Sequence, residues 1–388
     1  MCAMRAWPRT VWSLPTKALT QLQAWPCRVR FRYKFVPRAT GSDAMLAGLI
    51  TGAGRCEVRE FPEPTPRVGC VVVDITYCGI CGTDVHAYQS GRSYRPAICG
   101  HEWTGTVSAT GRGVVSISEG DRVVVGAPAP CGACAECEAG FREHCLACVA
   151  VLHGRDADAP PHGGFAARIA VNAGRVVAAH AALSDETLAQ VEPTAVALHA
   201  VNRSALRSGE TAVVVGAGAV GLTVMQCAIA AGAHEVVVVE PNSARRSMAA
   251  RLGATAVCSS DAAADIVADH TRGLGANVAF DCVGGTAALT TSVSLARRGG
   301  RVCLIGFKHG DTSIDSALWL RKEISVAGAI GYQRSEVASA MDLLASGAVR
   351  VDELHTSTTS IGGLAATLAE LSSGTSNQMK VLVKPTWS

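Results

Sequence analysis

The chain has 388 residues, of which 48% are hydrophobic and 17% are charged, so it can bury a large core and is not a disordered protein. Its 40 glycines and 15 prolines follow no period, which excludes a fibrous repeat, and no apolar run approaches the roughly 20 residues that cross a bilayer, so we expect a soluble protein of two or three domains. The net charge of +3 comes from the first 42 residues, which hold eight basic and no acidic side chains; the other 27 basic and 32 acidic residues give no support to nucleic-acid binding.

Residues 1–44 form a basic N-terminal extension that we separate from the fold. Its arginines are compatible with a mitochondrial presequence, but it equally fits a leader with no structural role, because Met45 opens an apolar strand pattern. The 16 cysteines accompany no secretory signal, and many have metal-like spacing. These features favour a reducing, cytoplasmic location.

From residue 45 to residue 194 the pattern is that of a mostly β domain. It predicts strands at 71–76, 105–108, 122–125, 165–171 and 176–178. Residues 128–148 are rich in cysteine and have no hydrophobic periodicity. Something other than a hydrophobic core must therefore organise that stretch.

From about residue 195 apolar strands alternate with helices that have an apolar face. This alternation predicts a parallel sheet covered by helices on both sides. The end of the chain, from residue 331, adds two helices and a closing strand. The predicted strands are 212–215, 235–239, 278–281, 301–305 and 379–383, and the predicted helices are 195–206, 219–231, 244–252, 287–296, 336–346 and 361–371.

The strongest motif is Cys131-x2-Cys134-x2-Cys137-x7-Cys145. Four thiolates in a loop without a core of its own suit a closed tetrahedral zinc site, whose binding free energy replaces hydrophobic burial. An iron–sulfur cluster uses similar cysteine counts and is the alternative. Because four protein ligands leave no open position, we expect a structural role.

A second motif places Cys81, Thr83 and His86 together, and His101 and Glu102 follow about twenty residues later. A thiolate, an imidazole and a nearby carboxylate are the ligand types of a catalytic zinc that keeps one position for a substrate oxygen. Taken alone, this motif is weak evidence, since a buried cysteine or a capping histidine is common.

The third motif is a Gly-x-Gly-x-x-Gly that follows an apolar strand and opens a helix. Gly216 suits the tight turn, Gly218 the approach of a pyrophosphate, and Gly221 the packing of helix on strand. Glu240 ends the next strand, where a carboxylate accepts hydrogen bonds from ribose hydroxyls and repels a 2′-phosphate, so NAD is favoured over NADP. The residues expected to contact the cofactor are Gly216, Gly218, Val220, Gly221, Glu240, Arg245 and Ile305.

Taken together, these three motifs make residues 45–388 resemble the zinc-containing medium-chain dehydrogenase/reductase family, and in particular its sorbitol, butanediol and threonine dehydrogenase branch. The resemblance implies an α/β protein with two domains. A GroES-like, mostly β catalytic domain would comprise residues 45–194 and 331–388 and carry the structural-zinc lobe at 131–145. A doubly wound Rossmann domain that binds NAD would comprise residues 195–330.

The resemblance also implies roles for single residues. Cys81 and His101 would hold a catalytic zinc, and either Glu102 or Glu192, in a Glu-Pro dipeptide, would be the third protein ligand. Thr83 would pass the proton of the alcohol outward, and His86 would lie near the end of that relay. Each chain would then hold two zinc ions, one catalytic and one structural.

The function that follows is hydride transfer between a secondary alcohol, such as a small diol or polyol, and NAD. An L-threonine 3-dehydrogenase would share nearly all these motifs and is one alternative. A cofactor-binding relative without activity is another, but the presence of Cys81, Thr83 and His101 argues against it. The expected partners are a small alcohol or ketone and further copies of the chain, as a dimer or tetramer, without nucleic acid or membrane.

Overall fold

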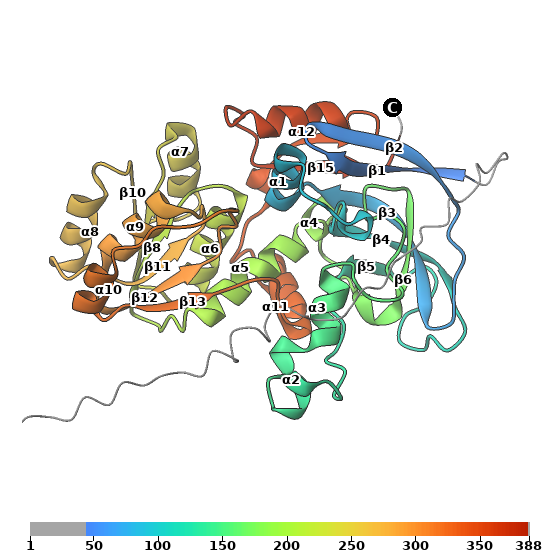
Figure 1. The fold of residues 1–388 in the computed structure, drawn as a ribbon, viewed down its shortest axis with the longest axis horizontal. Coiled ribbons are helices and arrows are strands. Elements are labelled where there is room, and N and C mark those ends of the chain that lie inside the picture. The colour runs from blue at the N-terminus through green and yellow to red at the C-terminus, as the bar shows by residue number, and fades with distance from the viewer. Residues whose placement is uncertain (1–43, 387–388) are drawn as a thin grey trace, which may run out of the picture. The chain divides into compact units, whose positions relative to one another are not determined.

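The computed structural model describes residues 44–386, whose strands form sheets of two, six and seven strands (Figure 1). The predicted N-terminal extension therefore lies outside the described residues, except for Ala44, which begins strand β1. β1 (Ala44–Gly52) pairs antiparallel with β2 (Arg55–Pro62). None of the helices in the described part of the chain is long and apolar enough to span a bilayer.

The seven-stranded sheet has the order β14-β15-β3-β4-β5-β7, and β6 also pairs with β3. Strands β14 and β15 come from the end of the chain, so distant segments lie side by side in this sheet. Its apolar residues pack with Trp103 and Phe165 into one core. The strands are β3 (Cys70–Gly79), β4 (Glu102–Thr110), β5 (Arg122–Val125), β6 (Arg168–Asn172), β7 (Val176–Ala178), β14 (His355–Ser360) and β15 (Lys380–Lys384).

Helix α1 (Gly82–Ser90) was not predicted, because its sequence has no apolar stripe. It begins where the Asp84 carboxylate accepts a hydrogen bond from the Cys81 N–H, and it ends at Gly91, whose φ of +62° is the left-handed conformation that favours glycine. Helices α4 (Asp185–Leu188) and α12 (Leu364–Ser372) pack against strands, whereas α2 (Ala135–Glu138) and α3 (Leu146–Leu152) lie in and beside the cysteine-rich segment.

The six-stranded sheet is parallel, with the order β10-β9-β8-β11-β12-β13, which is that of a doubly wound dinucleotide-binding fold. Its central strands are rich in valine because helices cover both faces. The strands are β8 (Thr211–Val215), β9 (Glu235–Val239), β10 (Ala256–Cys258), β11 (Ala276–Asp281), β12 (Ala296–Leu304) and β13 (Ser325–Gly328). The helices are α6 (Ala219–Ala230), α7 (Ser243–Arg251), α8 (Ala263–Thr271), α9 (Thr286–Leu295) and α10 (Ser316–Lys322).

Helix α5 (Val191–Arg203) begins earlier than predicted, at Val191 rather than at residue 195, so that Glu192 lies in its first turn. It packs against α11 (Arg334–Ala345). His199 on α5 contacts Glu336 on α11, with 2.8 Å between Nδ1 and Oε2, so this histidine packs between two helices.

Arg334, at the start of α11, joins this helix to the neighbouring strands. Its guanidinium donates hydrogen bonds to the carbonyl oxygens of Ala127, Gly174 and Val176. We expect Arg334→Met to lower the free energy of unfolding by about 2–4 kcal/mol, since the acceptors lose a charged donor. Denaturant unfolding measures this change.

The matched control is Arg298→Met, because Arg298 and its partner Glu323 are largely exposed, at 74% and 73%. This variant should lie within about 0.5 kcal/mol of the parent protein. Equal stabilities for the two variants would contradict the role assigned to Arg334.

Candidate functional site

The structure brings three predicted metal ligands together. The ligand atoms of Cys81, His101 and Glu102 all lie within 4.8 Å of one another. Cys81 precedes α1, and His101 precedes β4, whose first residue is Glu102. A thiolate, an imidazole and a carboxylate at this spacing fit zinc, and three protein ligands leave a coordination position open.

Hydrogen bonding orients the imidazole of His101 toward this cluster. Its Nδ1 donates to the carbonyl oxygen of Ile98 at 3.0 Å, which leaves Nε2 with a free lone pair. Nε2 lies 3.4 Å from the hydroxyl oxygen of Thr83. The nitrogen that can bind a metal therefore faces both Cys81 and Thr83.

Asp84, which the sequence analysis did not select, holds the two ligand segments together. Its Oδ2 accepts from the N–H of Cys81 at 2.9 Å, and its Oδ1 accepts from the N–H of Gly100 at 3.3 Å and from the Tyr94 hydroxyl at 2.8 Å. Burial raises the pKa of this carboxyl, and the charge of His101 opposes the rise. Its place three residues after Cys81, at a helix start, was the available signal.

Lys380 is the second functional residue that the sequence analysis missed. Its ammonium lies 2.6 Å from Oε2 of Glu102, and both side chains are almost fully buried. Burial lowers the pKa of Lys380, but the charges of Glu102, Cys81 and Glu192 and the hydrogen bond to Glu102 together outweigh that effect and raise it, so the ammonium is charged at neutral pH. The only local signal was a charged residue at the start of an apolar strand.

The strand between them explains how this pair forms. Gly79 of β3 lies opposite Glu102 of β4, and Leu382 of β15 pairs with Gly79 on its other side. A Cβ atom on residue 79 would lie 2.1 Å from Oε2 of Glu102. Glycine at this position therefore lets the carboxylate and the ammonium meet across β3.

Glu192, the other candidate carboxylate, lies outside the cluster of three but close enough to interact with it electrostatically. Burial raises the pKa of Glu192 to about 7; the charge of His101 lowers it and that of Glu102 raises it. The hydroxyl of Tyr332 also contacts this carboxylate. Of the two candidate carboxylates, Glu102 is therefore the one that belongs to the cluster with Cys81 and His101.

Thr83 and His86 lie on the same side of α1, three residues apart. Burial lowers the pKa of His86, and the charge of Lys308 lowers it further. His86 is therefore neutral at physiological pH and can accept a proton.

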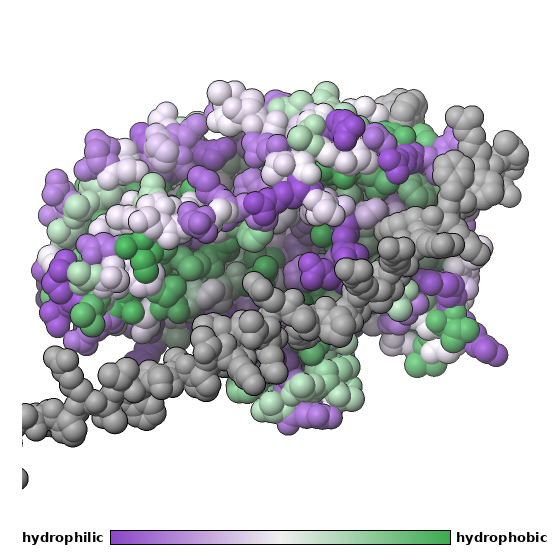
Figure 2. All heavy atoms as spheres, in the orientation of Figure 1, coloured by the Kyte–Doolittle hydropathy of each residue, from purple (hydrophilic) through white to green (hydrophobic). Residues whose placement is uncertain are grey.

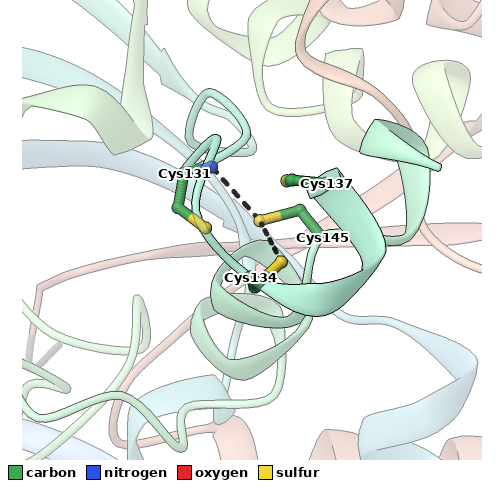
Figure 3. Close-up of side chains that lie close together, drawn as sticks. All are labelled: Cys131, Cys134, Cys137 and Cys145. Atoms are coloured by element: carbon green, nitrogen blue, oxygen red, sulfur yellow. Dashed lines mark hydrogen bonds between the residues drawn. The ribbon is translucent and has the colours of Figure 1, made fainter. Parts of the chain in front are cut away.

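The four lobe cysteines form a second cluster, with all sulfur atoms within 4.8 Å of one another (Figure 3). The Sγ atoms of Cys134 and Cys145 are 3.9 Å apart, close to the about 3.8 Å expected between two ligands of a tetrahedral zinc with Zn–S bonds of about 2.3 Å. Cys148 lies outside the cluster, and its thiol donates to the carbonyl oxygen of Pro128. The donor set fits zinc.

Backbone N–H groups stabilise the thiolate form of Cys145 in this lobe. Burial raises the pKa of the Cys145 thiol, but hydrogen bonds from the N–H groups of Cys131 and Cys148 outweigh it and bring the pKa to about 6. The N–H of Cys131 lies 3.2 Å from this sulfur, as the dashed line in Figure 3 marks. A thiolate is the form that binds a metal.

The glycine motif forms the turn between β8 and α6. Gly216 has a φ of +96°, and a Cβ there would lie 2.4 Å from Val283, while a Cβ on Gly221 would lie 1.9 Å from the carbonyl oxygen of Gly216. The space around Gly218, at the start of α6, is open. This open helix N-terminus fits a pyrophosphate, and Val220 lies in its first turn.

Glu240 lies at the end of β9, against the glycine turn. Its two carboxylate oxygens accept from the N–H groups of Ala217 and Asn242, both at 2.8 Å. Arg245 follows on α7, and its Nε is buried without a hydrogen-bond partner among residues 44–386. Ile305 follows β12 and donates its N–H to Asp281 at the end of β11. These residues therefore lie at the carboxyl ends of neighbouring strands.

Replacing a lobe cysteine should release metal and destabilise the protein. We expect Cys134→Ser to lower bound zinc, measured by elemental analysis, and to lower the melting temperature, because the lobe has no core to replace the metal. Cys148→Ser is the control and should keep both. Full zinc content and stability in Cys134→Ser would contradict a structural metal site.

Removing Lys380 should leave the Glu102 carboxylate buried without its cation. We expect Lys380→Met to lower the free energy of unfolding by about 3–5 kcal/mol. The double variant Lys380→Met/Glu102→Gln should recover much of that loss, because no charge remains unpaired. A double variant that is no more stable than the single one would contradict this account.

Comparison with known proteins identifies the family. Residues 67–181 match the family model of the alcohol dehydrogenase GroES-like domain, and residues 219–346 match that of the zinc-binding dehydrogenase domain. The chain is 33% identical over 344 residues to 2-dehydro-3-deoxy-L-galactonate 5-dehydrogenase of Pseudoalteromonas atlantica, covering 88% of this chain and 98% of the relative. It is 33% identical over 327 residues to L-threonine 3-dehydrogenase of Streptomyces coelicolor, covering 81% and 92%.

Among solved structures, 2R,3R-butanediol dehydrogenase from Bacillus subtilis matches with a TM-score of 0.75 and 28% identity. The match covers 88% of this chain and 100% of the butanediol dehydrogenase chain. These matches confirm the predicted fold class, a GroES-like domain combined with a Rossmann sheet. The chain belongs to the zinc-containing medium-chain dehydrogenase/reductase family.

Proposed function

We propose that this protein is a zinc-dependent oxidoreductase that transfers a hydride between a secondary alcohol, a small diol or polyol, and NAD, and so interconverts the alcohol and its ketone. The observation that carries the proposal is the convergence of Cys81, His101 and Glu102 within 4.8 Å. Its open coordination position suits a substrate oxygen. Family membership and relatives named as butanediol and sugar-acid dehydrogenases support the same reaction.

When bound, zinc would polarise the alcohol oxygen and NAD would accept the hydride. The hydroxyl of Thr83, next to His101, can take the alcohol proton while it gives up its own. His86 lies one turn further along α1, and its lowered pKa leaves it neutral and able to receive that proton. The ammonium of Lys380 lies 2.6 Å from Oε2 of Glu102 and balances a negative charge on that buried carboxylate.

The carboxylate of Glu240 supports NAD as the cofactor rather than NADP. It lies at the end of β9, beside the glycine turn, where it would repel a 2′-phosphate. Each carboxylate oxygen accepts one backbone N–H and keeps a lone pair for a ribose hydroxyl. A second zinc in the cysteine lobe completes the proposed cofactor set.

We also propose self-association into a dimer or tetramer. The support is the edge strand β13, which is solvent-exposed and carries Val326, whose side chain is 38% exposed. Leu320 before this strand and Ile330 after it are 79% and 74% exposed. Figure 2 shows hydrophobic residues gathered over α10 and β13. The described cysteines are all free, which supports a reducing compartment such as the cytoplasm.

The test is the initial rate of NADH formation by the purified protein with vicinal diols, polyols, threonine and simple primary alcohols, and with NADP in parallel. Turnover of diols or polyols with NAD is the expected result. Turnover of threonine alone would favour the L-threonine 3-dehydrogenase alternative, which the similarity to the Streptomyces relative keeps open. No turnover by a protein that holds zinc would favour a cofactor-binding relative without activity.

Replacing the proposed cysteine ligand should separate chemistry from cofactor binding. We expect Cys81→Ser to lower kcat by about a thousandfold or more while the Kd for NAD changes by less than about twofold. Cys78→Ser is the matched control, because Cys78 is a buried thiol outside the cluster. Parallel loss of NAD binding and turnover in Cys81→Ser would show that the residue is structural.

A further inference from the structure

Three basic side chains gather near the C-terminal end of α1, on the side of His86. Arg92 follows that helix, and its Nη1 donates a hydrogen bond to Nδ1 of His309 at 3.2 Å. Lys308 precedes His309 in the exposed loop after β12. Lys308 is close enough to His86 for its charge to act on that histidine. Arg92, Lys308 and His309 are called the cationic cluster below.

Local contacts hold the cationic cluster in place. The ring of His309 packs edge-on against Phe307, with ring centroids 4.7 Å apart and an interplanar angle of 76°. The side chain of Lys308 lies along the turn after β11, where a Cβ on Gly285 would be 3.0 Å from its Cδ and 3.5 Å from its Nζ. The absence of a side chain at Gly285 therefore makes room for the lysine.

No carboxylate neutralises the cationic cluster. Within residues 44–386, neither Arg92 nor Lys308 forms an ion pair. Asp84 is the only acidic residue between Cys81 and Gly100, and it is buried, with its oxygens already engaged by the backbone and by Tyr94. Because arginine always donates, Nδ1 of His309 is the acceptor and its Nε2–H remains a donor.

The position of the cationic cluster relates it to the substrate. Lys308 and His309 follow the carboxyl end of β12, and ligands of parallel α/β sheets bind outside the carboxyl ends of the strands. His86 lies five residues, or about 7.5 Å of helix, beyond Cys81. A group held by the cationic cluster would therefore lie several carbon atoms from the alcohol carbon.

We propose that the cationic cluster binds an anionic group, a carboxylate or a phosphate, at the far end of the substrate, so that sugar acids or sugar phosphates are preferred over neutral polyols. A guanidinium hydrogen-bonded to an imidazole, with an ammonium close to the neighbouring His86 and no ion-pair partner for either cation among the described residues, suits such an anion. This inference rests on the proposed function, because it concerns a second part of the same substrate site.

The first experiment compares three compounds with one carbon skeleton: sorbitol, sorbitol 6-phosphate and gluconate. With NAD at low ionic strength, kcat/KM should favour one anionic compound over sorbitol by about tenfold or more, and added salt should reduce the preference. A preference for gluconate identifies a carboxylate site, and a preference for the 6-phosphate identifies a phosphate site.

Charge removal then tests the cationic cluster itself. Arg92→Gln and Lys308→Met should each lower kcat/KM for the preferred anionic compound by about fivefold, with a change below about twofold for sorbitol in Arg92→Gln and for the KM of NAD in both variants. Arg112→Gln is the matched control, since Arg112 is an exposed cation beyond the opposite end of β4 from Glu102. It should change none of these values.

The outcomes separate this proposal from the proposed function. If kcat/KM for sorbitol equals that for its anionic analogues and salt does not change it, the anion site is overturned and the proposed reaction stands. A raised KM for NAD in the Arg92 and Lys308 variants would also overturn it, because the cations would then serve the cofactor.

If none of the compounds is turned over, the proposed function fails and equilibrium binding decides the anion site. Calorimetry would then measure gluconate and sorbitol 6-phosphate binding to the protein loaded with zinc and NAD. Binding of one anion that Arg92→Gln weakens and Arg112→Gln does not would support the site. Equal binding by both variants, or none by the parent protein, would overturn it.

Discussion

The ion pair between Glu102 and Lys380 lies in the middle of three strands and is buried from solvent. A buried carboxylate without a counter-charge is strongly destabilising, so the strand that carries Lys380 must pair beside β3 before the site is complete. Glycine at position 79 provides the space in which the pair meets. Because His101 directly precedes Glu102, the same constraint places the imidazole next to Cys81. The proposed reaction centre thus depends on the end of the chain.

The two cysteine-containing clusters are held together by different interactions. The lobe cysteines lie in a stretch with only short helices and little buried apolar surface, so metal coordination takes the place of a core. Around Cys81 hydrogen bonds organise the surroundings instead, because Asp84 joins the start of α1 to the segment before β4. The first arrangement suits a structural ion and the second suits a centre with an open position.

The proposed relay and the proposed anion site share the same charges. The charge of Lys308 helps to keep His86 neutral, and Lys308 forms the cationic cluster with Arg92 and His309. An anion bound there would offset those charges and make His86 a stronger base. Recognition of the far end of the substrate would therefore be coupled to proton transfer at its reacting end.

Local patterns in the sequence were sufficient for the fold class and for the motifs. Four strands and three helices of the Rossmann sheet were predicted, because strands buried on both faces are continuous apolar runs and their helices have an apolar stripe. The short or exposed elements β10, α8, α10 and β13 were not predicted. The cysteine spacing and the glycine turn are equally local. Tertiary structure alone brought Glu102 rather than Glu192 within 4.8 Å of Cys81 and His101. It alone joined Lys380 to Glu102 across 278 positions of sequence, and Arg92 to His309 across 217, because side chains so far apart leave no common pattern in the chain.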